Sequence, residues 1–138
     1  MSLERFTRRE LIAVPPDASA EEVARVMRAR HVGAVLVVDD GRPVGIVTDR
    51  DLVVRLLADG WTPSAPIRAV MTRELVLAKV DDGIDQAFFT MRRYGIRRLP
   101  IVDGGGTIVG LVALDDLLVL LGGEVSSLVE TVLDNRGP

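Results

Sequence analysis

Two residues in the first third of the chain have types and a spacing that could recognise a small polar molecule. Thr48 and Asp51 are three residues apart, where a predicted strand is followed by a predicted helix. An ionised carboxylate only accepts hydrogen bonds, and its two oxygens suit the two adjacent hydroxyls of a ribose. A threonine hydroxyl at a helix start can donate to a phosphate. The pair therefore predicts a sugar–phosphate site, with Asp51 on the sugar.

The same spacing is also typical of a helix N-terminal cap. In that interpretation the Thr48 hydroxyl and the Asp51 carboxylate each bond a backbone N–H of the first turn. Both roles are compatible in the ligand-free protein. A second copy of the pattern keeps the carboxylate as Asp116 but has Ala113 in place of the threonine. Loss of one hydrogen bond to a charged phosphate weakens binding by about 1.5–3 kcal/mol. We therefore expect the first copy to be the better site.

Composition excludes several classes of chemistry. The 138 residues contain no cysteine and one histidine, His31, so neither a cysteine or multi-histidine metal site nor a thiolate nucleophile is possible. We expect no metal, no required cofactor and no catalytic residue. A net charge of -3 argues against nucleic-acid binding. No apolar run approaches the roughly 18 residues of a membrane span, and no signal-peptide core is apparent, so a cytoplasmic location is expected.

The chain repeats itself, and this decides the architecture that must position these residues. Arg9-Glu10-Leu11 recurs as Arg73-Glu74-Leu75, an offset of 64, which becomes 65 after one extra residue near Gly106. We predict a first repeat at 7–60, a linker at 61–69, a second repeat at 70–122, and a C-terminal helix and tail at 123–138. Each repeat reads as strand, helix, two strands and helix (β-α-β-β-α), an α+β class.

The repeated motifs resemble those of the cystathionine-β-synthase (CBS) domain family. The segment Gly45-Ile46-Val47-Thr48-Asp49-Arg50-Asp51 is similar to the family signature, and so is Tyr94-Gly95-Ile96-Arg97-Arg98-Leu99-Pro100-Ile101-Val102-Asp103. The resemblance covers nearly the whole chain in two copies, as in small stand-alone prokaryotic CBS pairs. It implies two repeats packed about a pseudo-twofold axis, and a regulatory module rather than an enzyme.

The resemblance also implies ligands and the residues that bind them. Family members bind adenosine-containing ligands, so AMP, ADP, ATP and S-adenosylmethionine are the candidates, in two clefts between the repeats. It places arginine near the phosphates, here Arg97 or Arg98. Because neighbours in a strand point to opposite faces, we expect at least one to face a cleft. It places the base against opening segments, namely Ile12 and Ala13 for one cleft and Val76 and Leu77 for the other. Asp116 is the second ribose carboxylate.

The apolar closing helices indicate association with another chain. They carry Leu52, Val53, Leu56 and Leu57 in the first repeat, and Leu117, Leu118, Leu120 and Leu121 in the second. Helices of this composition need burial, and in the family they form a homodimer. Two alternatives remain open: a pair that dimerises without binding a nucleotide, and a small hydrolase or transferase. The sequence identifies neither the nucleotide, nor a regulated partner, nor a parallel or antiparallel dimer.

Overall fold

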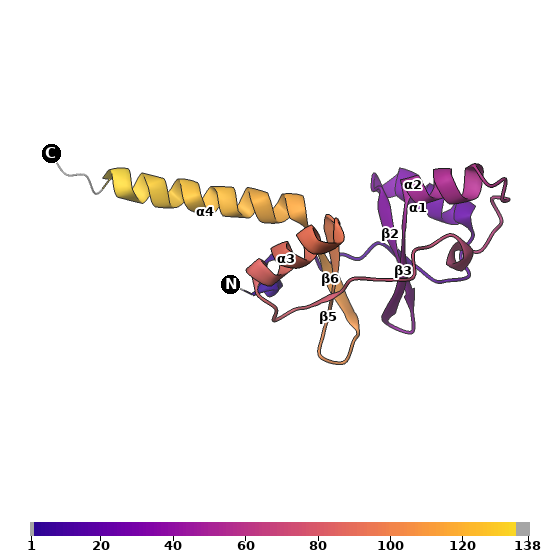
Figure 1. Cartoon of the computed structure of the whole chain (residues 1–138), viewed down its shortest axis with the longest axis horizontal. Coiled ribbons are helices and arrows are strands. Elements are labelled where there is room, and N and C mark those ends of the chain that lie inside the picture. Colours follow the sequence, from indigo (N-terminus) through magenta and orange to yellow (C-terminus); the bar gives the residue numbers. More distant parts are fainter. Residues whose placement is uncertain (1, 135–138) are drawn as a thin grey trace.

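The computed structural model describes residues 2–134, which form two α+β units placed side by side (Figure 1). The first unit contains β1 (Ala13–Val14), α1 (Ala20–Arg30), β2 (Ala34–Asp39), β3 (Arg42–Thr48), α2 (Asp49–Asp51) and a π-helical continuation of it, η2 (Leu52–Leu57). The second contains β4 (Ala78–Lys79), α3 (Ile84–Tyr94), β5 (Arg98–Val102), β6 (Ile108–Ala113) and α4 (Leu114–Asp134). Single 3-10 turns precede each unit: η1 (Leu3–Phe6) and η3 (Ile67–Ala69).

Each unit holds a three-stranded sheet of the same topology. The orders are β1-β2-β3 and β4-β5-β6, with a parallel pair first and an antiparallel hairpin second. Both hairpins have a register shift at equivalent places, after Val37 and after Ile101. The β-α-β-β-α order and the α+β class predicted from the sequence are confirmed.

Local signals in the sequence fix where the helices begin and end. Ser19 and Glu22 form the predicted capping box of α1, with each side chain bonded to the other residue's backbone N–H. Helix α1 ends at His31, which adopts the left-handed conformation with φ 54°. Helix α3 ends at Gly95, with φ 63°, a conformation that glycine adopts without the Cβ penalty.

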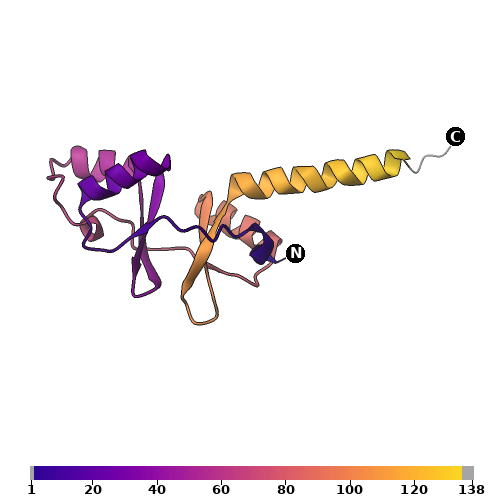
Figure 2. The ribbon, with the colours of Figure 1, turned by 180° about the vertical axis from the view of Figure 1, so that it is seen from behind.

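The segment before each repeat packs against the other repeat. Leu3 and Phe6 of η1 are buried in the core of the second unit, together with Met91, Leu99 and others. Ile67 and Val70, which the offset of 64 makes their equivalents, are buried in the core of the first unit. In Figures 1 and 2 the N-terminal end accordingly lies beside α3. The predicted linker 61–69 is therefore not a free connection, because its last residues complete a core.

Two glycines make this crossed packing possible. Gly110 of β6 lies against Thr7 and Arg8, so an added Cβ would overlap the Arg8 carbonyl oxygen and the Thr7 methyl group. Gly45 of β3 is its counterpart: an added Cβ would overlap Met71 Sδ, and the nearest backbone atom, the Thr72 carbonyl oxygen, would lie 3.1 Å away. Backbone cannot move as easily as a methionine side chain, so the second position is the more tolerant.

This difference gives a testable prediction on stability. Gly110→Ala should lower the free energy of unfolding by about 3 kcal/mol, because the N-terminal segment must separate from β6. The matched variant Gly45→Ala should lose only about 1 kcal/mol, because Met71 can change rotamer. Urea denaturation of both variants measures the difference. A loss in Gly45→Ala as large as in Gly110→Ala would contradict the greater tolerance of the Gly45 position.

The C-terminal helix differs from the prediction in one respect. A closing helix and a separate helix from residue 123 were expected, but α4 is a single helix of 21 residues that passes through Gly122 and Gly123. The two glycines suggest a break between two helices, but glycine only weakens a helix interior and does not end it. Residues 135–138 of the predicted tail lie outside the described residues. None of the helices within residues 2–134 is both long and apolar enough to cross a bilayer.

Candidate functional site

A cavity between the two units collects most of the predicted site residues. Thr48 at the end of β3 and Asp51 in α2 line it from the first repeat. Arg97, Arg98 and Val76 line it from the second. Its other lining residues are mostly apolar: Ala34, Ile46, Thr72, Glu74, Leu75, Ile96 and Pro100. The cavity thus combines two carboxylates, two hydroxyls, two guanidinium groups and an apolar wall.

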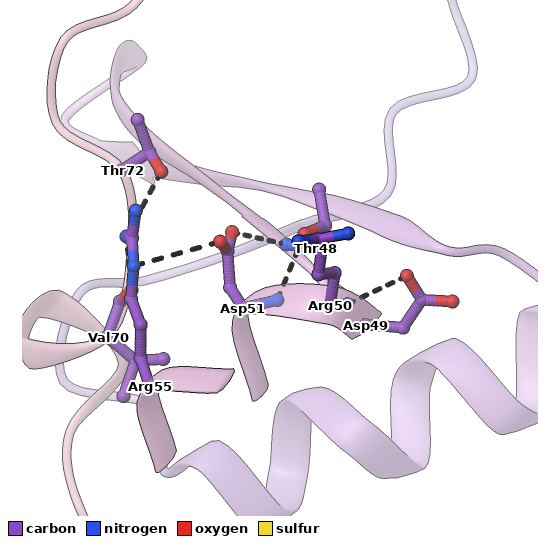
Figure 3. Close-up of polar contacts among 7 residues, drawn as sticks. All are labelled: Thr48, Asp49, Arg50, Asp51, Arg55, Val70 and Thr72. Carbon is purple, nitrogen blue, oxygen red and sulfur yellow. Dashed lines mark hydrogen bonds and ion pairs between the residues drawn. The ribbon is translucent and has the colours of Figure 1, made fainter. Parts of the chain in front are cut away.

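Thr48 and Asp51 form a capping box in this cavity. The Thr48 N–H donates to Asp51 Oδ2 (2.9 Å), and the Asp51 N–H donates to Thr48 Oγ1 (3.2 Å). Figure 3 shows Asp51 between Thr48 and Arg55, whose Nε lies 3.8 Å from Asp51 Oδ1. The capping role predicted as an alternative is therefore confirmed. The box still leaves the Thr48 hydroxyl proton and most of the capacity of Oδ1 for a ligand.

Arg55 ties this region to the segment that leads into the second repeat. Its Nη1 donates to the carbonyl oxygen of Val70 (3.0 Å) and to Thr72 Oγ1 (3.1 Å). Figure 3 shows Arg55 beside Val70 and Thr72 on one side, with Asp51 on the other. Because Arg55 has these nearer partners, its interaction with Asp51 is long and only partly neutralises the carboxylate.

A second cavity is built from the equivalent residues of the other repeat. Ile12, Asp116 and Ala113 line it where Val76, Asp51 and Thr48 line the first. Its remaining lining residues are Arg8, Glu10, Leu11, His31, Val32, Gly33, Ala34, Leu36, Ile46, Arg98, Leu111 and Asp115. The repeat in the sequence thus reappears as two related cavities with different polar groups.

In the second cavity the carboxylate already has a cationic partner. Arg8 Nη2 donates to Asp116 Oδ1 at 2.7 Å, and Arg8 Nε lies 2.6 Å from Asp116 Oδ2. Only Oδ1 accepts a hydrogen bond from Arg8; Oδ2 lies at ion-pair distance from Arg8 Nε and is itself buried. Asp116 is therefore less available to a sugar than Asp51.

Arg8 is a site residue that the sequence reasoning missed. The offset of 64 makes it the equivalent of Thr72, and each bonds the backbone of the hairpin facing it, at Leu111 and Ile46 respectively. The signal was present in the repeat alignment. Arg8 precedes Asp116 by 108 positions, and only the crossed packing brings the two together.

The side chains of Arg97 and Arg98 do not point to opposite faces of a strand. Both line the first cavity, because β5 begins at Arg98 and Arg97 lies just before the regular alternation. Arg97 pairs with Asp115 (Nη2 to Oδ1, 2.7 Å). The guanidinium of Arg98 has no ion-pair partner among residues 2–134, and it lines both cavities. Arg98 is therefore the available cation between the two clefts.

Two predicted residues lie apart from both cavities. Ala13 and Leu77 are exposed and line neither, whereas their neighbours Ile12 and Val76 do. Side chains alternate along extended backbone, so one member of each pair points away. Among residues 2–134, no group of three or more His, Asp and Glu side chains is placed to hold a metal ion.

Comparison with known proteins identifies the family. The model of the CBS domain matches twice, at residues 3–58 and 67–123. The chain therefore belongs to the CBS domain family and contains two tandem repeats. Both matches extend to the turns η1 and η3 that the structure shows crossing between units.

Two curated proteins are similar over most of the chain. The CBS domain-containing protein YhcV of Bacillus subtilis is 39% identical over 110 residues, which are 80% of this chain and 78% of YhcV. Uncharacterized protein MK0525 of Methanopyrus kandleri is 36% identical over 120 residues, or 86% of this chain. The chain spans only 61% of the length of that second relative.

Two solved structures show the same fold with ligands bound. The CBS domain pair of protein MJ0100, in complex with 5'-methylthioadenosine and S-adenosyl-L-methionine, has a TM-score of 0.78 and 26% identity, covering 90% of this chain and 98% of that one. CBS domain protein PAE2072 from Pyrobaculum aerophilum, complexed with AMP, has a TM-score of 0.76 and 25% identity, covering 85% and 90%.

Proposed function

We propose that this chain is a regulatory module, not an enzyme, that binds an adenosine-containing ligand in the cavity around Thr48 and Asp51. The observation that carries the proposal is the meeting of Asp51 and Thr48 from one repeat with Arg98 from the other. Bound AMP and S-adenosylmethionine in similar structures support the class of ligand.

Each group has a chemical task in this proposal. Asp51 Oδ1 accepts hydrogen bonds from the ribose hydroxyls, and the Thr48 hydroxyl donates to the first phosphate. Arg98 neutralises phosphate charge, with Arg97 available if its exposed pair with Asp115 opens. Ile46, Val76 and Pro100 provide the apolar surface for the base. AMP, ADP and ATP use all of these groups, whereas S-adenosylmethionine has no phosphate and offers the arginine only its methionine carboxylate.

Thermal denaturation with a ligand panel tests the proposal. A ligand at a hundred times its dissociation constant stabilises the folded state by about 2.7 kcal/mol. For a chain of this size the melting temperature should rise by several degrees. The panel contains AMP, ADP, ATP, S-adenosylmethionine and adenosine, with GMP as the base control. Absence of a shift with every adenosine compound, together with no adenosine compound in the purified protein by mass spectrometry, would overturn it.

A second candidate function is a CBS pair that only dimerises. It is favoured by one observation: both carboxylates already have structural partners, Asp51 in its capping box and Asp116 with Arg8. The ligand panel separates the two candidates.

We also propose a homodimer in both cases, and a cytoplasmic location. Val53, Val54 and Leu57 of the first closing helix and Leu118 and Val119 of α4 are between 49% and 73% exposed, which leaves apolar surface for a partner. Leu117, in contrast, is fully buried in the chain's own core. Sedimentation at micromolar concentrations should show a species of twice 15.0 kDa. A 15.0 kDa species alone would contradict the homodimer.

A further inference from the structure

Helix α4 extends beyond the body of the protein. Its first turns are anchored, since Leu117 is fully buried and Glu124 pairs with Arg5 at 2.6 Å. After Glu124 every residue as far as Asp134 is exposed. Figures 1 and 2 both show this half of the helix projecting away from the two units. The described part of the chain therefore provides no cover for it.

The projecting half is apolar. Five large aliphatic side chains are between 51% and 66% exposed: Val125, Leu128, Val129, Val132 and Leu133. Two consecutive glycines, Gly122 and Gly123, lie before them, and each is about 1 kcal/mol less favourable than alanine in a helix. Most of the stability of a protein helix comes from packing of its apolar face, so this half of α4 needs a surface to pack against.

The apolar side chains follow a coiled-coil spacing. Leu118, Leu121, Val125, Leu128 and Val132 are separated by three, four, three and four residues. In heptad terms, Leu118, Val125 and Val132 occupy a, and Leu121 and Leu128 occupy d. In parallel coiled coils, valine at a with leucine at d favours two strands over three or four.

The flanking positions favour a second copy over a different partner. The positions e and g beside the stripe are Gly122, Glu124, Val129 and Thr131, of which only Glu124 is charged. Glu124 is already paired with Arg5 of its own chain. In a parallel pair it would face Val129 of the other helix, so like charges would not meet. No pattern of e and g charges is present to select a different helix.

We propose that the stripe from Leu118 to Val132 forms a parallel two-stranded coiled coil with the same stripe of a second copy. The inference rests on the proposed homodimer and names the surface that carries it. It is independent of nucleotide binding, because the stripe contains no residue that lines either inter-repeat cavity.

Disulfide trapping tests the proposal directly, because the chain has no cysteine of its own. In a parallel pair two residues at position a face each other across the axis, close enough for a disulfide. Val132→Cys should therefore give mostly cross-linked dimer on mild oxidation. The matched control Glu130→Cys, at position f on the far side, should stay monomeric on a non-reducing gel. Equal cross-linking of the two variants would overturn the proposal. A Val132→Cys variant that stays unlinked would also overturn it, because that is the result expected of an antiparallel pair.

A second pair of variants addresses affinity. Leu128→Glu should raise the dimer dissociation constant at least tenfold by sedimentation equilibrium, whereas Ser127→Glu, at position c, should leave it within about twofold. Both side chains are exposed in the single chain, so circular dichroism of the two variants should match. If the wild-type protein is a monomer, both the proposed homodimer and the proposed coiled coil are wrong. If it is a dimer whose dissociation constant does not change in Leu128→Glu, only the coiled coil is wrong. In either case the result of the ligand panel is unaffected.

Discussion

Asp51→Ala should remove most of the rise in melting temperature that an adenine nucleotide produces, whereas Asp116→Ala should leave most of it. The reason is the state of the two carboxylates. Asp51 Oδ1 has only a distant partner, Arg55 Nε at 3.8 Å, and the Thr48 hydroxyl lies in the same cavity. Asp116 Oδ1 accepts a hydrogen bond from Arg8, Oδ2 is buried beside Arg8 Nε, and Ala113 provides no hydroxyl in that cavity.

The expected magnitudes follow from the contacts that are lost. A hydrogen bond to a charged group contributes about 1.5–3 kcal/mol, so losing the ribose contacts should weaken binding by at least about ten- to a hundredfold. Without ligand, Asp51→Ala should lower the free energy of unfolding by only about 1 kcal/mol, the usual effect of a lost helix cap. Isothermal titration calorimetry and thermal denaturation of the same samples measure both quantities.

Two outcomes would contradict this assignment in different ways. If Asp116→Ala removes the shift and Asp51→Ala does not, the ligand occupies the second cavity. If neither substitution matters while wild type still responds to the ligand, Thr48 and Asp51 act only as a cap. Asp51→Asn is the conservative variant, because it keeps an acceptor for the Thr48 N–H but removes the charge.

Arg98→Ala should reduce phosphate-dependent affinity more than any other single arginine substitution. Its guanidinium has no ion-pair partner among residues 2–134 and lines both cavities, so every bound phosphate near the middle of the molecule can reach it. We expect AMP and ATP to bind about ten- to a hundredfold more weakly. Adenosine, which has no phosphate, should bind as to wild type.

Arg97→Ala is the matched control for this prediction. Arg97 lines only the first cavity and already pairs with Asp115 at 2.7 Å, so its loss should reduce AMP affinity less than the loss of Arg98. Calorimetry with AMP and adenosine on both variants provides the comparison. A loss of adenosine binding equal to that of AMP would mean that Arg98→Ala disturbs the cavity itself. If Arg97→Ala reduces AMP affinity more than Arg98→Ala does, the phosphate lies nearer Arg97 than Arg98.

The sequence alone predicted the features that local chemistry controls. The capping box at Ser19, the left-handed end at Gly95 and the paired strands of each hairpin depend on residues close together in the chain. Repetition at a fixed offset then gave the doubled β-α-β-β-α order. Thr48 and Asp51 could be selected for the same reason, since their spacing sets their geometry whether they cap a helix or bind a ligand.

Only the tertiary structure decided which distant segments meet. Leu3 and Ile67 cross to complete the other repeat's core, and this crossing brings Arg8 to Asp116 and distinguishes the two cavities. It also places Arg98 at both clefts and leaves half of α4 without cover. The physical reason is that apolar burial has no preferred direction: a buried leucine or isoleucine is stabilised against any well-fitting core. The apolar pattern of a segment therefore predicts that the segment is buried. Only the packing of the whole chain determines which other segment buries it.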